Sequence, residues 1–164
     1  GAPLAMVIGC GFTQSEALFG IQWHVLAMFG PSFITGSLIS RFGAEKVVAL
    51  GLIILMACAF VAHQGVALWN FWVALILLGL GWNFGFIGST SIVAQSYRPH
   101  EADKVQGFHD IILFSSVASA SYASGLVYSA YGWNTMNLIV WPITIAGLIL
   151  LTLLILRKNG DAAA

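Results

Sequence analysis

The sequence has little charge. Only 7% of its 164 residues are charged, whereas 59% are hydrophobic, and a soluble domain has about 25% charged residues. Six basic and six acidic side chains cannot cover the polar surface that a soluble protein of this size needs. The composition therefore predicts a protein whose surface largely faces lipid.

The sequence also lacks features that several other functions need. A formal net charge of zero argues against nucleic acid as a partner. The two cysteines, Cys10 and Cys58, lie in apolar segments and are expected to be small buried residues, not a disulfide or a metal pair. No basic segment precedes Gly1–Cys10, so no signal peptide is predicted. Nothing in the sequence indicates a cofactor.

Long stretches contain no charge at all. Val47–Tyr97 and Ile111–Leu156 contain no Asp, Glu, Lys or Arg, and Gly1–Ser40 contains only Glu16. One helical crossing takes roughly 20 residues, so each long stretch holds two crossings and the first holds one crossing and a stub. Barrel strands are excluded because the apolar runs do not alternate. We predict an all-α, polytopic membrane bundle with helices at about 1–10 (partial), 17–40, 47–62, 69–97, 111–131 and 136–156.

The basic residues fall in only three places. Arg41 and Lys46, Arg98 and Lys104, and Arg157 and Lys158 occupy alternate connections, while the connections at 11–16, 63–68 and 132–135 have no Lys or Arg. By the positive-inside rule, the basic connections and the tail at 159–164 are cytoplasmic. Tryptophan and tyrosine near the opposite ends are typical of an aromatic belt at the outer interface, namely Trp69, Trp72, Tyr131 and Trp133.

One cytoplasmic turn has a distinctive pattern. Gly36-Ser-Leu-Ile-Ser-Arg41-Phe-Gly43 resembles the G-x-L-x-x-R-x-G signature of the major facilitator superfamily, which joins the second and third helices of each six-helix half. It departs from the fullest pattern at Ser40, where the family often has Asp, and at Ala44-Glu45, where a basic pair is common. Such a degraded copy is typical of the second half. Counting helices around it identifies residues 1–158 as a partial helix seven plus helices eight to twelve.

The resemblance implies a secondary active transporter of a small organic solute by alternating access, not an enzyme, in a bacterial inner membrane. Its expected partners are membrane lipid, the solute and a missing N-terminal half of the same chain, because this sequence lacks an initial Met and starts within an apolar segment. In the signature turn, Gly36 is expected to allow close helix contact, Arg41 to bind carbonyls or acids, and Gly43 to permit a tight turn. Gln106 and Asp110 are expected in a cytoplasmic gate.

Polar and aromatic side chains inside the predicted spans are the candidates for a substrate cavity. No charged side chain lies inside a span, and His24 is the only ionisable side chain there of the kind used for proton coupling. Secondary transporters bind substrate near the bilayer midplane, and a buried amide needs a partner. Helix packing is the alternative role for each candidate, and the candidates are Gln22, Trp23, His24, Trp82 and Asn83.

Small residues predict where helices touch. Gly81 and Gly85 form a GxxxG pair, and Ser115 and Ser119 begin a small face on a later helix. Pro31 is expected to bend the first full helix because proline removes a hydrogen bond.

Two other functions stay open at this point. The polar segment at 98–110, with His100 and His109, could belong to a membrane-embedded enzyme, although its spacing matches no zinc site and a solvated connector is the simpler interpretation. The chain could also be a small self-contained membrane protein that acts as an oligomer.

Overall fold

A computed structural model describes residues 1–163. Every regular element within this range is helical, which confirms the all-α prediction. The elements are α1 (Ala2–Leu4), the π-helix η1 (Ala5–Gly9), α2 (Gln14–Phe29), α3 (Ser32–Phe42), α4 (Ala44–His63), α5 (Leu68–Ala94), the 3-10 helix η2 (Pro99–Glu101), α6 (Ala102–Leu138) and α7 (Val140–Ala163).

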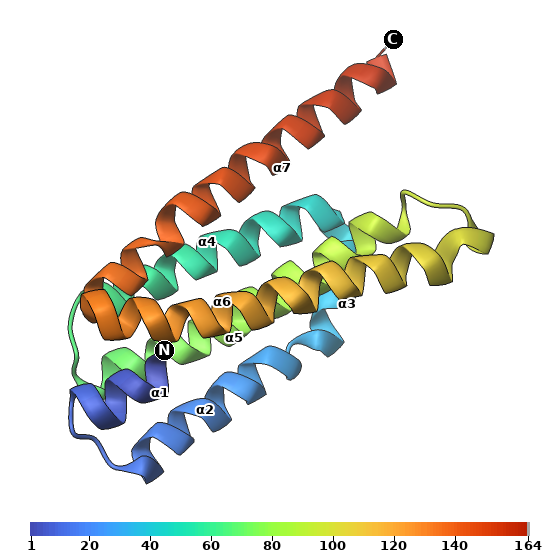
Figure 1. Cartoon of the computed structure of the whole chain (residues 1–164). Coiled ribbons are helices and arrows are strands. Elements are labelled where there is room, and N and C mark those ends of the chain that lie inside the picture. The colour runs from blue at the N-terminus through green and yellow to red at the C-terminus, as the bar shows by residue number, and fades with distance from the viewer. Residues whose placement is uncertain (164) are drawn as a thin grey trace.

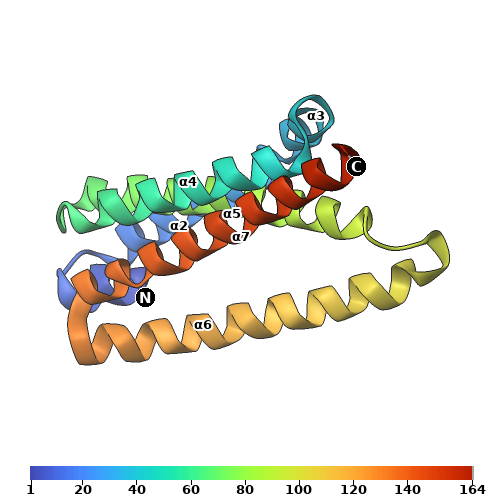
Figure 2. The same ribbon diagram turned by 90° about the horizontal axis from the view of Figure 1, so that it is seen from above.

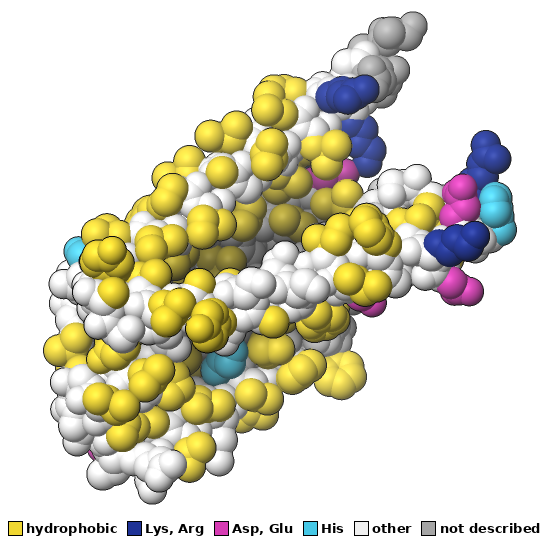
Figure 3. Space-filling view, in the orientation of Figure 1, with side chains coloured by type: hydrophobic (Ala, Val, Ile, Leu, Met, Phe, Trp, Pro, Cys, Tyr) yellow, Lys and Arg dark blue, Asp and Glu magenta, His cyan; other side chains and the backbone are white. Residues whose placement is uncertain are grey.

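Five helical segments of the described chain are long and apolar enough to cross a membrane. They are Gln14–Phe42, Ala44–His63, Leu68–Ala94, Pro99–Leu138 and Val140–Lys158. Hydrophobic side chains cover the lengths of the helices on the face shown in Figure 3, and Phe33 is 92% exposed. This surface suits a lipid environment, as the composition predicted.

The connections sort to two ends of the bundle. The turns between α1 and α2, α4 and α5, and α6 and α7 gather at one end, whereas the α5–α6 connection and the end of α7 lie at the other (Figures 1 and 2). Lys and Arg side chains lie near the end of α7 and at the tip of the α5–α6 hairpin at that second end (Figure 3). The helices thus separate the basic connections from those without Lys or Arg, and the assignment of one end to the cytoplasm stays a prediction.

Helix α5 lies at the centre and packs on α2 and α4. Its glycines permit this close packing. An added Cβ at Gly51 of α4 would lie 2.9 Å from the nitrogen of Gly85 and 3.0 Å from the oxygen of Gly81 on α5. The two backbones approach this closely because both helices have glycine at this crossing.

The predicted helix at 17–40 is broken into α2 and α3 at Gly30 and Pro31. Pro31 has no N–H, so the carbonyl of Ala27 lacks its regular donor four residues later. Helix α2 itself begins with a capping box, in which Glu16 accepts from the Thr13 nitrogen at 2.8 Å. This role accounts for the one charged residue in the first forty.

Helix α6 extends beyond the predicted span at both ends. It begins at Ala102, not at Ile111, and Asp103 lies in its first turn. Near its other end Gly132 has φ 78° and ψ −177°, a break within the connection predicted at 132–135. Figure 2 shows α6 set apart from the other helices along most of its length, and of its residues only Asn137 is buried.

Candidate functional site

A cavity of about 720 Å³ lies between α4, α5, α6 and α7, with His24 of α2 at its wall. The surface is hollowed between α6 and α7 in Figure 3. The volume is in the range of about 300–1,000 Å³ that small-molecule sites have. Apolar side chains make up most of the lining, and none of the lining residues is Asp, Glu, Lys or Arg. A neutral, largely apolar molecule fits these walls best.

His24 is one of the two predicted cavity residues that line this space. Its Nδ1 lies 2.8 Å from the carbonyl oxygen of Leu75 on α5. The backbone of α2 passes close to α5 here because Gly79 leaves room beside the His24 carbonyl. The ring is therefore held at the wall by contacts to the central helix.

Trp82 is the second predicted residue in the lining. It is half-buried and stacks on Phe86 of the same helix, with ring centroids 6.0 Å apart and ring planes 7° apart. Residues four apart lie on one face of a helix, so the pair forms a flat aromatic surface on α5. Such a surface can stack on a planar ligand.

Trp133 and Phe71 form another part of the wall, which the sequence did not indicate as a site. The Trp133 Nε1 donates to the carbonyl of Ala62 at 2.8 Å, and its ring lies 4.8 Å from that of Phe71. The sequence predicted Trp133 only as a belt residue. A role of Trp133 in a cavity wall was hard to predict from the sequence, because its hydrogen bond to Ala62 joins residues 71 positions apart.

Asn83 is buried, with 2% of its surface exposed, and it does not line the cavity. Its Nδ2 donates to the Met28 carbonyl and to the Ser32 hydroxyl, each at 2.7 Å. Its Oδ1 accepts from the Thr35 hydroxyl at 2.5 Å. This amide therefore connects α5 to both sides of the α2–α3 break, an arrangement that supports the packing role over the cavity role.

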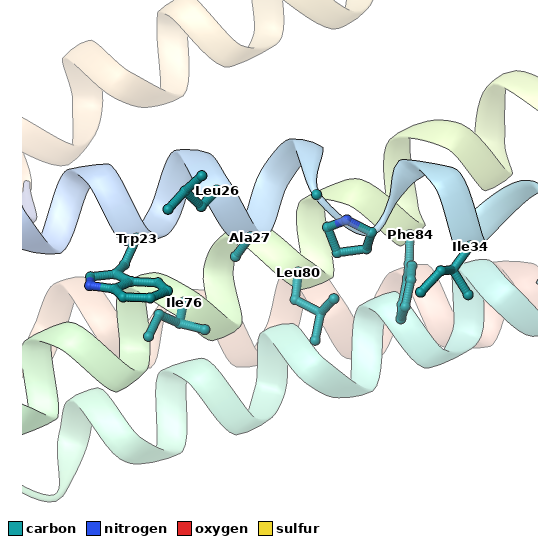
Figure 4. A pocket seen from close by; sticks show the side chains of 9 residues that line it. Trp23, Leu26, Ala27, Ile34, Ile76, Leu80 and Phe84 are labelled. Atoms are coloured by element: carbon teal, nitrogen blue, oxygen red, sulfur yellow. The ribbon is translucent and has the colours of Figure 1, made fainter.

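The remaining cavity candidates lie elsewhere on α2. Trp23 lines a separate groove of about 520 Å³ between α2–α3 and α5, which includes Pro31 and Phe84 and is lined mostly by apolar side chains (Figure 4). Gln22 is exposed and lines neither space. The structure thus brings His24 and Trp82 to one cavity and separates Gln22, Trp23 and Asn83 from it.

In the signature turn, the structure gives Gly43 the clearest role. Gly43 has φ 91° and joins α3 to α4 directly, a conformation that favours glycine. Gly36 has no atom within 4 Å of an added Cβ among the described residues, so any close contact it makes lies outside them. The Arg41 guanidinium lies 5.3 Å from the Phe42 ring centroid.

One ion pair joins this turn to the last helix. Lys158 Nζ lies 2.8 Å from Glu45 Oε1, so the acidic residue that departs from the family signature contacts the basic end of α7. An exposed pair of this kind contributes little stability. It does place the two basic segments at the same end of the bundle.

The predicted gate residues lie in and near the α5–α6 connection. Gln106 Nε2 donates to the Tyr97 hydroxyl at 2.8 Å, and Asp110 Oδ1 lies 3.2 Å from Nδ1 of its neighbour His109. Within residues 1–163 no group of three or more metal-ligand side chains comes together. The segment has the contacts of a solvated connector.

The predicted packing residues behave differently from one another. Gly81 is buried against α4, where an added Cβ would lie 2.8 Å from Leu55 and 3.0 Å from the Gly51 oxygen. Gly85 has open space at its own Cβ position in the described structure. Ser115 and Ser119 are exposed on α6, and the Ser119 hydroxyl donates to the Ser115 carbonyl at 2.8 Å.

Comparison with known proteins identifies a family and several relatives. The family model described as "Major Facilitator Superfamily" matches residues 4–164. The chain is 50% identical over 163 residues to the riboflavin transporter RfnT of Brucella anthropi, which covers 99% of the chain and 40% of that protein. It is 33% identical over 130 residues to the uncharacterized MFS-type transporter YddS of Bacillus subtilis, covering 78% of the chain and 30% of that protein.

A more distant relative is the methylenomycin A resistance protein of Bacillus subtilis, 23% identical over 156 residues, which covers 92% of the chain and 34% of that protein. No solved structure matches the chain. The chain thus spans two fifths or less of the length of these relatives.

Proposed function

Because this chain belongs to the major facilitator superfamily, we propose that it is the C-terminal half of a secondary active transporter that works by alternating access. Membership makes it part of a multi-pass membrane transporter and not an enzyme, so the membrane-enzyme alternative is wrong. The position of the signature turn, after the first full span with four spans following, supports the second half.

The proposed location is a bacterial inner membrane with the C-terminus in the cytoplasm. Support comes from the bundle itself, since Glu45 and Lys158 bring the signature turn and the end of α7 together. Basic residues at the tip of the α5–α6 hairpin lie at that same end (Figure 3). The positive-inside rule then assigns this end to the cytoplasm.

The proposed solute is a small, uncharged, flat aromatic molecule, and riboflavin is the first to test. The observation that carries this proposal is the 50% identity to a protein named a riboflavin transporter. The cavity is compatible with such a solute, because its walls are apolar and include the flat surface of Trp82. An uncharged cavity disfavours strongly charged solutes unless the other half supplies the countercharge.

Uptake by the full-length protein tests this function. The protein is expressed in bacteria that cannot make riboflavin, and accumulation of labelled riboflavin is measured against cells with an empty vector. We expect saturable uptake that excess unlabelled riboflavin abolishes. Trp82→Ala, which removes the flat surface, is expected to lower uptake severalfold at unchanged membrane abundance.

The opposite result is equally clear. Accumulation equal to that of the empty vector, in cells whose membranes contain the folded protein, contradicts riboflavin import.

A further inference from the structure

We infer that His24 recognises the solute by accepting a hydrogen bond at Nε2 from a ring N–H of a flat, uncharged heteroaromatic compound. This inference rests on the proposed function and adds a specificity-determining residue to it. Three observations support it: the contact of His24 with Leu75, the hydrogen bonds of other polar groups in the lining, and the spacing along α5 between Leu75 and Trp82.

The Leu75 contact determines which ring nitrogen has the hydrogen. A carbonyl oxygen only accepts hydrogen bonds, so the Nδ1 that lies 2.8 Å from it is the donor. A neutral imidazole has a single N–H, so Nε2 then has a lone pair and no hydrogen. Among the described residues Nε2 has no hydrogen-bond partner, and His24 belongs to the cavity wall. The ring thus presents an acceptor in a fixed orientation.

Several other polar groups of the lining are already bonded to backbone carbonyls. The side-chain donors and their carbonyl acceptors are Cys58 and Ala74 at 3.1 Å, Ser124 and Ser121 at 2.8 Å, Trp133 and Ala62 at 2.8 Å, and Asn137 and Trp133 at 2.9 Å. These pairings stabilise the walls but leave the groups less able to turn toward a solute. The backbone contact of His24 holds its ring through Nδ1 and leaves Nε2 as an acceptor.

The position of Trp82 relative to His24 suggests the size of the solute. His24 is anchored beside Leu75, and Trp82 lies seven residues further along α5, which is about 10 Å at 1.5 Å per residue. A fused aromatic ring system about 10 Å long can lie on Trp82 and reach His24 with one edge. An edge with an N–H would then pair with Nε2. A buried acceptor left unpaired disfavours an analogue that lacks this N–H.

The experiment compares riboflavin with 3-methylriboflavin, which keeps the fused rings but has a methyl group in place of the imide hydrogen. The concentration for half-maximal uptake is measured for both solutes with the full-length protein. We expect the wild type to favour riboflavin about tenfold, the usual effect of one hydrogen bond in a buried site. In His24→Phe, which keeps a flat ring without the acceptor, the preference is expected to disappear, so that the two solutes give equal half-maximal concentrations.

Two further variants make the comparison sharper. His24→Gln supplies a side-chain carbonyl as an acceptor and is expected to recover part of the preference. Trp82→Phe is the matched variant in the same cavity, and it is expected to weaken uptake of both solutes while the tenfold ratio persists. Each ratio compares two solutes in one variant, so a change in the amount of folded protein does not affect it.

The outcomes separate this inference from the proposed function. If the wild type imports riboflavin but His24→Phe retains the full preference over 3-methylriboflavin, the role of His24 is refuted and the proposed function stands. If the folded wild-type protein imports no riboflavin at all, both the proposed solute and the inference are refuted.

Discussion

At the residue scale, Asn83 shows how one amide stabilises an interrupted helix within lipid. Proline at position 31 leaves backbone oxygens of α2 without their regular donors, and an unpaired backbone group in hydrocarbon is costly. Asn83 donates to the Met28 carbonyl in the last turn of α2 and also pairs with the hydroxyls of Ser32 and Thr35. The break and the amide on α5 therefore depend on each other.

Asn83→Ala is expected to destabilise the full-length protein by about 2 kcal/mol, because it removes three hydrogen bonds and leaves a buried carbonyl unpaired. The measurement is the free energy of unfolding, or the thermal midpoint, of the purified protein in detergent. Gln22→Ala is the control, since it removes an exposed amide of α2, and it is expected to change stability by less than about 0.5 kcal/mol. Equal effects of the two substitutions would contradict the role of Asn83.

The sequence predicted that Asn83 needs a partner but not which partner. The cost of burying an amide is a property of the residue, and it can be known without a structure. The partners lie 48 to 55 positions away, and only the crossing of α5 over the break brings them together. The same limit applies to His24, whose anchor at Leu75 is 51 positions away.

At the scale of helices, α5 uses glycines on two faces to approach two neighbours. Gly81 faces α4, whereas Gly79 faces α2. An added Cβ at Gly79 would lie 3.0 Å from the Ala27 Cβ and 3.1 Å from the Met28 nitrogen. Backbone atoms cannot move aside as a flexible side chain can, so α2 and α5 would have to separate.

Gly79→Ala is therefore expected to destabilise the protein by about 1–3 kcal/mol and to lower its yield in monodisperse form from detergent. Gly85→Ala is the matched control on the same helix. Its Cβ position is open in the described structure, and alanine favours a helix over glycine by about 0.5–1 kcal/mol. We expect Gly85→Ala to be neutral or slightly stabilising, and a Gly79→Ala protein as stable as Gly85→Ala would show that the helices do not approach this closely.

The sequence predicted the existence of the helices better than their ends. Hydropathy marks the part of a helix that lies in lipid, so the span Leu68–Ala94 was found closely. It does not mark where the helix continues into water, and α6 therefore starts earlier than its apolar stretch, at Ala102. Pro31 indicated a bend, but whether a proline bends or breaks a helix depends on neighbouring groups such as Asn83.

At the scale of the whole molecule, the alternation of basic and non-basic connections along the sequence becomes a difference between the two ends of the bundle. Alternate connections have basic residues, and the antiparallel course of the spans brings these connections to one end (Figures 1 and 3). The sequence could predict this sorting because it requires only a count of crossings. It could not predict the cavity, whose wall combines residues of six helices, because each contribution depends on how the helices rotate and tilt.

Single cysteines at the two ends test the sidedness of this arrangement. Asp103→Cys in α6 and Gln64→Cys between α4 and α5 are placed in a full-length protein without its native Cys10 and Cys58. Both positions are exposed, unlike Ala44 in the signature turn, which is buried at 1% exposure. A membrane-impermeant maleimide is added to cells whose inner membrane is intact. It is expected to label Gln64→Cys, because this connection has no Lys or Arg and faces outward by the positive-inside rule. Asp103→Cys is expected to react only after the membrane is permeabilised, and labelling of both positions in sealed cells would overturn the predicted orientation.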